Sequence, residues 1–304
     1  MGKRIAGINL AKNGSFVILN DGEIEFYLEE ERVTRSKRDI SAKTLANKYI
    51  DSSVDALAIC DSFTRYTKKT YLETTKAKNE ICKIAKSKGC LSIVDYRQRH
   101  HECHAANAFY NSGFDDAVCV VMDGKGSFYT DDSVSRVSGF GDVGVSLKYA
   151  EIESIYDYSG KFTPLFKHFS TFWSEDEADL MDEPYWYKGN LYSNRVSVGQ
   201  AFRNVSRYCG FEEIEAGKTM GLSAYGHSAV SSDIFNEEYD HSLCSTMFKP
   251  DGNTTKYTGA ELRWEDLAYR LQKSAEKHAI FMIKKAMKLS GKNNIVLSGG
   301  FFLN

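Results

Sequence analysis

The sequence predicts an α/β protein made of two similar halves, each of which opens with antiparallel strands and continues into helices. Short apolar segments separated by Gly- and Asn-containing turns open the chain, as in a β-meander. A continuous apolar run at 117–122 opens a second group of such segments. After each group, apolar residues recur with the period of a helix. The same order of elements, found twice, indicates a duplicated architecture.

The first half begins with three predicted strands joined by tight turns. Lys12-Asn13-Gly14 and Asn20-Asp21-Gly22 have the composition of turns, and Gly89 ends the last helical pattern. The predicted elements are, in order, strands at 4–10, 15–19 and 23–27 and helices at 41–50 and 67–88.

The second half begins with the run at 117–122, which has the pattern of a strand buried on both faces. Alternating segments near 126–130, 134–140 and 144–154 predict a second meander. The stretch 155–195 is aromatic and irregular, and no element is assigned to it. The remaining predicted elements are helices at 196–209 and 264–289 and a strand at 294–298.

The composition narrows the class of protein. The chain has 39 Lys and Arg against 41 Asp and Glu, which argues against a basic nucleic-acid scaffold. Seven cysteines include no Cys-x-x-Cys pair, so reduced thiols are expected. The first residues lack the apolar stretch of a signal peptide, and no window resembles a membrane span. We therefore predict a cytoplasmic protein with no membrane and no nucleic-acid partner.

A histidine-rich segment at 100–109 is the most informative part of the chain. Three of the seven histidines fall within five residues, and the segment from Glu102 onward is typical of a helix. On a helix, His100 and His104 are one turn apart and project from one face, so both can bind one cation. His101 and Cys103 point elsewhere. The alternative is that the pair is surface or capping histidine.

Asp123 is the predicted third ligand. It follows the buried strand at 117–122 and precedes a Gly-x-Gly turn, and ligands in α/β sheets gather at the carboxyl ends of strands. Two imidazoles and one carboxylate suit Fe(II), Mn(II) or Zn(II) and leave positions open for substrate oxygens. The sequence therefore predicts a divalent-metal site made by His100, His104 and Asp123.

Three further segments have candidate anion-binding features. Lys218 lies between glycines at 217–226, where backbone amides and an ammonium suit phosphate, although the spacing is not that of a Walker A loop. Ser298-Gly299-Gly300 follows a strand and allows close approach of a nucleotide, or is an ordinary turn. The charged run 29–38 is either solvent-exposed or brings Arg35, Lys37 or Arg38 to an anionic ligand.

Together, these segments resemble the carbamoyltransferases of the NodU/CmcH type in order and spacing. The matching segments are Gly7-Ile8-Asn9, Asp21-Gly22, Glu29 to Lys37, His100 to Ala106, Asp123 to Gly126, Gly217 to Gly226 and Ser298 to Asn304. The resemblance implies an actin-like (ASKHA, ribonuclease H-like) duplicated fold. The first lobe is then expected at 1–115, with the metal-binding helix, and the second at 116–304, incomplete and with an irregular insertion near 155–195.

The resemblance also implies a metal, usually taken as iron, on His100, His104 and Asp123, with zinc or manganese as alternatives. Nucleotide, as ATP or carbamoyl-adenylate, is expected at one group of residues: Lys37, Lys218, Gly221, Gly299, Gly300 and Asn304. Family members carry a His-Asp pair in the first turn, where this chain has Lys12-Asn13. Lys12 and Glu215 are therefore the candidate catalytic residues.

The implied activity is O-carbamoyl transfer. Members of the family make carbamoyl-adenylate from carbamoyl phosphate and ATP in a YrdC-like domain and pass the carbamoyl group to an acceptor hydroxyl in the actin-like domain. We expect a further aspartate ligand and the YrdC-like domain beyond residue 304, in a separately encoded or removed C-terminal part. The alternatives are a non-catalytic metal- or nucleotide-binding remnant and an actin-like ATPase.

Overall fold

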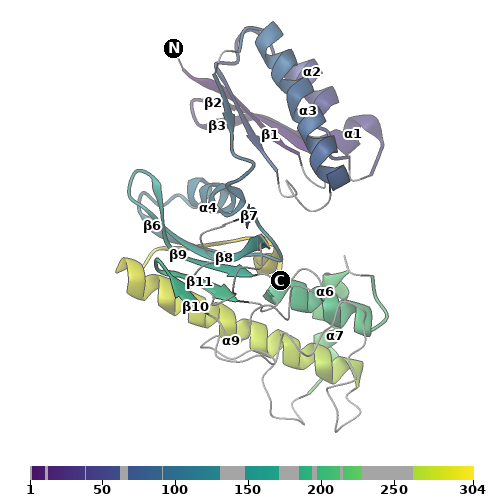
Figure 1. Cartoon of the computed structure of the whole chain (residues 1–304), viewed down its shortest axis with the longest axis vertical. Helices are drawn as coiled ribbons and strands as arrows, with labels where there is room; N and C mark the ends of the chain where they lie inside the picture. The colour runs from purple at the N-terminus through teal and green to yellow at the C-terminus, as the bar shows by residue number, and fades with distance from the viewer. Residues whose placement is uncertain are drawn as a thin grey trace, which may run out of the picture. The chain divides into compact units, whose positions relative to one another are not determined.

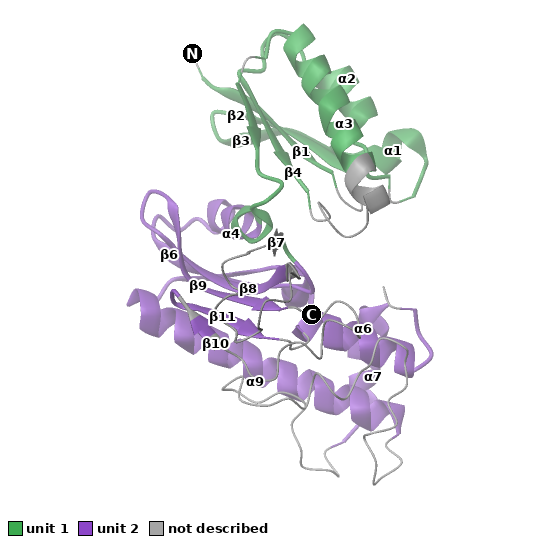
Figure 2. Ribbon diagram, in the orientation of Figure 1, with its two compact units in different colours: residues 1–103, 126–128 green, residues 104–125, 129–304 purple. Residues whose placement is uncertain are grey.

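A computed structural model describes residues 2–10, 13–37, 39–61, 68–90, 92–130, 148–170, 185–193, 197–212, 215–227 and 263–304. The chain divides into two compact units (Figure 2). Unit 1 comprises Met1–Cys103 and Gly126–Phe128, and unit 2 comprises His104–Lys125 and Tyr129–Asn304. The division falls inside helix α4 (His100–Tyr110), whereas the sequence placed the boundary after residue 115.

Unit 1 contains a five-stranded sheet in the order β3-β2-β1-β4-β5. The first three strands form the predicted antiparallel meander, and β4 and β5 continue the sheet in parallel. Asp21 and Gly22, between β2 and β3, have positive φ angles of 51° and 89°, as a two-residue hairpin turn requires. The elements are β1 (Arg4–Asn9), β2 (Ser15–Asn20), β3 (Glu23–Glu29), α1 (Glu30–Thr34), α2 (Lys43–Tyr49), β4 (Ala56–Cys60), α3 (Lys68–Ser87) and β5 (Ser92–Asp95).

Unit 2 contains a second sheet in the order β10-β11-β9-β8-β6-β12, and β7 also pairs with β8. The neighbours β6, β8 and β9 are antiparallel, whereas β12 is parallel to β6 and β11 is parallel to β9. The strands are β6 (Ala117–Met122), β7 (Phe128–Thr130), β8 (Lys148–Tyr158), β9 (Phe162–Ser170), β10 (Tyr185–Tyr187), β11 (Asn190–Ser193) and β12 (Ile295–Ser298). The helices are α6 (Val198–Tyr208), α7 (Ala216–Leu222), the 3-10 turns η1 (Ser223–Tyr225) and η2 (Gly300–Leu303), and α9 (Trp264–Ser290).

The two sheets repeat one topology. In each, a three-stranded antiparallel meander is followed, after helices, by a strand parallel to the first one: β4 beside β1, and β12 beside β6. The arrangement confirms the predicted duplicated α/β architecture. The order β3-β2-β1-β4-β5 is that of the ribonuclease H-like halves of the actin-like fold.

The stretch 155–195 differs from its prediction. Where the structure describes it, it holds the end of β8 and the strands β9, β10 and β11, so it is a regular part of the second sheet. The second meander is consequently β6, β8 and β9, and the segment 134–140, expected to contribute to it, lies outside the described residues.

Helix α9 runs along the second sheet in Figure 1. Its buried apolar side chains include Leu267, Leu271 and Met282, which pack with Val118, Val120 and other residues of the sheet in one core cluster. Gly291, with a φ of 70°, ends the helix in the left-handed conformation that glycine adopts most readily. None of the described helices is both long and apolar enough to cross a membrane.

The charged run after β3 contains a buried helix cap. Glu30 is fully buried, and its carboxylate accepts hydrogen bonds from the backbone N–H groups of Thr44 (2.7 Å) and Leu45 (3.0 Å) at the start of α2. The N-cap residue of α2 is Ala42, whose side chain cannot accept a hydrogen bond, so Glu30 supplies the acceptors that this helix end requires. Part of this run is therefore structural.

Replacing Glu30 by alanine should destabilise the protein by about 2 kcal/mol, because two N–H groups at the start of α2, one of them buried, lose a charged acceptor. Glu30→Gln keeps acceptor oxygen and should cost less. Urea unfolding of both variants measures the change. Glu23→Ala, at an exposed glutamate of β3, is the matched control and should change stability by less than about 0.5 kcal/mol. A Glu30→Ala variant as stable as this control would contradict the role of Glu30 as a cap.

Candidate functional site

Helix α4 carries the predicted histidine pair. The helix begins at His100, two residues earlier than the sequence indicated, and the backbone N–H of His100 donates to the Ser127 hydroxyl at 3.0 Å. Ser127 thus satisfies one of the free N–H groups at the start of the helix. His100 and His104 are one turn apart, as predicted, and both are half-buried.

The other polar side chains of this segment lie elsewhere. His101, predicted to point away from His100 and His104, is fully buried. The Cys103 thiol donates a hydrogen bond to Cys60 at the end of β4, and this bond lowers the pKa of Cys60. Neither cysteine belongs to the metal-ligand group.

Asp123 completes a group of three ligands. One donor atom each of His100, His104 and Asp123 lies within 4.8 Å of the other two, and the His104 Nε2 to Asp123 Oδ2 distance is 3.6 Å. The Asp123 backbone N–H donates to the Ile152 carbonyl (3.0 Å), and its Oδ1 accepts from the Gly124 N–H (2.7 Å). The three predicted ligands therefore have donor atoms close to one another, and metal binding by them stays a prediction.

The donor set fits a divalent transition metal. Two imidazole nitrogens and one carboxylate oxygen suit Fe(II), Mn(II) or Zn(II), and three protein ligands leave coordination positions for other oxygens. The side chains of His104 and Asp123 are 31% and 17% exposed, so the group is accessible from solvent.

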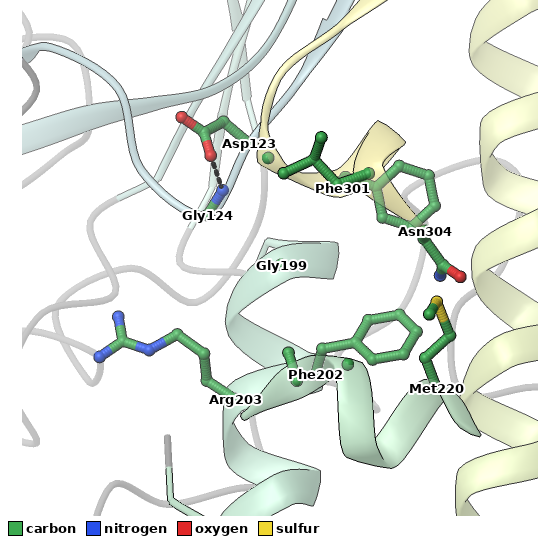
Figure 3. A pocket seen from close by; sticks show the side chains of 12 residues that line it. Asp123, Gly124, Gly199, Phe202, Arg203, Met220, Phe301 and Asn304 are labelled. Carbon is green, nitrogen blue, oxygen red and sulfur yellow. Dashed lines mark hydrogen bonds between the residues drawn. The ribbon is translucent and has the colours of Figure 1, made fainter. Parts of the chain in front are cut away.

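A cavity of about 330 Å³ lies beside Asp123 in unit 2. Phe202, Met220 and Phe301 give it apolar walls (Figure 3). In Figure 3, Asp123 and Arg203 lie at one end, and Met220 and Asn304 lie at the other. The full lining is Asp123, Gly124, Gly199, Phe202, Arg203, Ala216, Gly217, Met220, Gly300, Phe301, Leu303 and Asn304. The cavity thus combines apolar surfaces with a carboxylate and a guanidinium at one end.

Two glycines bring backbone segments close together at this place. A Cβ on Gly199 would lie 2.8 Å from the Gly124 nitrogen, and one on Gly299 would lie 2.1 Å from the Met122 carbonyl oxygen. Gly299 also has a φ of 100°, which other residues rarely adopt. Gly299 is therefore required by the packing of β12 against β6, independently of any nucleotide.

The residues predicted to bind nucleotide divide into those that line the cavity and those that do not. Gly300 and Asn304 line the cavity, whereas Lys218, Gly221 and Gly299 do not. Lys37 lies in an exposed turn of unit 1. The segment 217–226, whose backbone amides and lysine suit phosphate by sequence, is mostly helical, as α7 and η1.

The two catalytic candidates have different outcomes. Lys12 lies outside the described residues. Glu215 precedes α7 and forms an ion pair of 2.7 Å with Lys218. The hydrogen bond from Lys218 lowers the pKa of Glu215, and a carboxylate with a lowered pKa is a weaker base. This ion pair does not support a role for Glu215 in activating a hydroxyl. It also pairs the Lys218 ammonium with a carboxylate.

Sequence reasoning missed the part played by α6. Ser197 caps this helix by accepting from the Gln200 N–H (3.0 Å) and donates to the Gly124 carbonyl (2.7 Å). Gly199 and Arg203, on the first turns of α6, line the cavity. A serine before a helical pattern predicts a helix cap. Its hydrogen bond to Gly124 has no local signal, because the two residues are more than 70 positions apart in the sequence.

The fold and the site define an actin-like domain with a candidate metal centre at the end of β6. The family described as "Carbamoyltransferase N-terminus" matches residues 42–304, and the chain belongs to this family. The nodulation protein NolNO of Sinorhizobium fredii (strain NBRC 101917 / NGR234) is 22% identical over 318 residues. The alignment covers 95% of this chain and 40% of that relative.

Two solved structures align with almost the whole chain. The Lmo2764 protein from Listeria monocytogenes is 9% identical, with a TM-score of 0.44 over 99% of this chain and 84% of its own. A ROK family protein from Streptococcus pneumoniae TIGR4 is 11% identical, with a TM-score of 0.44 over 99% of this chain and 82% of its own.

Changing His104 to alanine should lower the metal content of the purified protein severalfold, because the group loses one of its three ligands. Elemental analysis for iron, zinc and manganese measures this. His227→Ala removes an exposed histidine of unit 2 that pairs with Asp266, and it should leave the metal content unchanged. Equal metal in His104→Ala and the unaltered chain would refute the assignment.

Proposed function

We propose that this chain is the actin-like part of an O-carbamoyltransferase. It would receive a carbamoyl group from carbamoyl-adenylate, made from carbamoyl phosphate and ATP, and pass it to the hydroxyl of a small-molecule acceptor. Membership of the carbamoyltransferase family is the observation that carries this proposal. Because the chain spans 40% of the NolNO relative, adenylate formation is assigned to a C-terminal part, in the same or a separate chain.

The metal would be held by His100, His104 and Asp123, as iron, zinc or manganese. Bound there, a divalent ion supplies positive charge that stabilises phosphate oxygens of the nucleotide and the departing AMP. The half-buried position of all three residues favours this role, since partly desolvated charges interact more strongly than those in bulk water.

The cavity beside Asp123 is the proposed nucleotide site. Phe202, Met220 and Phe301 offer apolar surfaces of the kind that bind the faces of a base. Arg203 lies at the same end of the cavity as Asp123, where a phosphate would meet both the metal and the guanidinium. Its Nη1 donates to Gln200 Oε1 at 3.3 Å, which orients the side chain.

In the proposed transfer step, the acceptor oxygen bonds to the carbamoyl carbon while the bond from that carbon to the AMP phosphate oxygen breaks, and AMP leaves as an anion. The hydroxyl proton passes to a base. Arg203 would stabilise the phosphate charge that develops on AMP. Lys12 remains a candidate for the base, whereas the ion pair of Glu215 with Lys218 makes that carboxylate a poor one.

The isolated chain should not release pyrophosphate from ATP in the presence of carbamoyl phosphate, because adenylate formation is assigned to the C-terminal part. Adding the remaining C-terminal part of a carbamoyltransferase in trans should restore this release and give a carbamoylated product. Pyrophosphate release and mass spectrometry of a panel of hydroxyl acceptors measure the two steps.

His104→Ala is the control for the second step: it should abolish product and leave pyrophosphate release intact. Carbamoyl-phosphate-dependent pyrophosphate release by the isolated chain would contradict the division of steps between the two parts. Pyrophosphate release without any carbamoylated acceptor would favour the non-catalytic alternative.

Arg203→Ala should weaken AMP binding roughly tenfold, because a charged hydrogen bond to phosphate is lost. Isothermal titration calorimetry with AMP measures the affinity. Arg207→Ala is the matched control, since Arg207 is exposed, lies one turn further along α6 and is not among the cavity-lining residues. Equal losses in both variants would indicate a general charge effect and contradict the placement of phosphate at Arg203.

A further inference from the structure

A buried polar network joins four elements of unit 2. Glu153 on β8 is 2% exposed, and its Oε1 lies 2.5 Å from His278 Nε2 on α9. Its Oε2 lies 3.2 Å from His168 Nδ1 on β9, and His168 Nε2 lies 2.7 Å from the Ser193 hydroxyl at the end of β11. His168, His278 and Ser193 are also buried.

The network holds an ionised carboxylate in the protein interior. Burial would raise the pKa of Glu153, but the charge of His278 and the hydrogen bonds from His168 and His278 outweigh it and hold this pKa below its ordinary value. Removing one partner of such a buried pair leaves an uncompensated charge. Glu153 therefore constrains β8, β9 and α9 together.

Two simpler roles do not fit. The atoms of His168, Glu153 and His278 do not form a metal-ligand group, since within the described residues only His100, His104 and Asp123 do so. The hydrogen-bonded series Ser193, His168 and Glu153 resembles the nucleophile, base and acid of a catalytic triad. Ser193 is 0% and His168 1% exposed, however, so substrate cannot reach them.

The network lies next to the strand that carries the proposed metal ligand. Glu153 is the register partner of Met122 on β6, and Met122 precedes Asp123. The neighbouring residue of β8, Ile152, accepts the hydrogen bond from the Asp123 backbone N–H. The carbonyl of Met122 is also the atom against which Gly299 packs. Glu153 is thus adjacent to Ile152 on β8 and opposite Met122 on β6, the two residues whose backbone contacts hold the segment at Asp123.

We propose that Glu153 is a positioning residue for Asp123: its buried carboxylate joins β8, β9 and α9 and so fixes the end of β6. The effect on metal affinity rests on the proposed metal site, since a ligand that is held less rigidly binds metal more weakly. Glu153 itself contacts neither metal nor substrate in this arrangement.

Glu153→Gln, which keeps shape and removes charge, tests the proposal in the full 304-residue chain. We expect the affinity for Mn²⁺ or Co²⁺ to fall roughly tenfold and the Co²⁺ absorption spectrum to change. Hydrogen exchange of the Asp123 amide should become severalfold faster, because its hydrogen bond to Ile152 opens more often. Both are measured well below the unfolding temperature, where a loss of global stability alone would not change the affinity of the folded protein.

Glu151→Gln is the matched control. Glu151 is a fully buried glutamate on the same strand, paired with Lys167 instead of with the histidines. It should leave metal affinity and Asp123 exchange within about twofold of the unaltered chain. If Glu153→Gln does not fold, His278→Gln replaces it, because it removes the contact from α9 and keeps the one to His168.

The outcomes separate this inference from the metal proposal. Failure of the unaltered chain to bind any of these metals would refute the metal site, and the exchange of the Asp123 amide would still decide the positioning role. Unchanged exchange in folded Glu153→Gln would overturn the inference. So would unchanged metal affinity in that variant when the unaltered chain binds metal.

Discussion

The close contact of backbone segments at Met122–Gly124 is the constraint on which the candidate site depends. Gly299 approaches the Met122 carbonyl and Gly199 approaches Gly124 where a methyl group would overlap with the main chain. Because no side chain intervenes, the carboxyl ends of β6 and β12 and the start of α6 meet directly. That convergence places Asp123, Gly300 and Arg203 around one cavity. Polar and apolar side chains therefore line the same small cavity, and no separate loop is needed to bring them together.

The same constraint explains why the site is at this edge of the second sheet. Strands β6 and β12 are parallel, so their carboxyl ends lie at one edge, where backbone groups are no longer used by the sheet. The Asp123 side chain accepts from the next backbone N–H, and its own N–H is held by β8. The other carboxylate oxygen, Oδ2, faces His104 Nε2 at 3.6 Å, so the local chain path sets which oxygen points toward the histidine.

Local patterns predicted what depends on local structure. The run at 117–122 gave β6, and the spacing of His100 and His104 placed both on one helix face, because a helix fixes that geometry by itself. Strands β9 and β11 were missed because their polar residues, His168 and Ser193, are buried through contacts with β8 and with each other, which disrupts apolar alternation. The cap that Glu30 provides for α2 and the lining by Arg203 likewise depend on tertiary contacts.

The positions of the three candidate ligands are controlled by different means. His100 and His104 are one helical turn apart, and intrahelical hydrogen bonds fix that distance whatever surrounds the helix. Asp123 is not part of a regular element, so its position relies on β8, on the glycine contacts and on the residues that hold β8 in register. A buried carboxylate between two histidines resists sliding of β8 more strongly than apolar packing does, because hydrogen bonds are directional. In the role proposed for Glu153, the polar network of unit 2 therefore acts on the one candidate ligand that the helix does not fix.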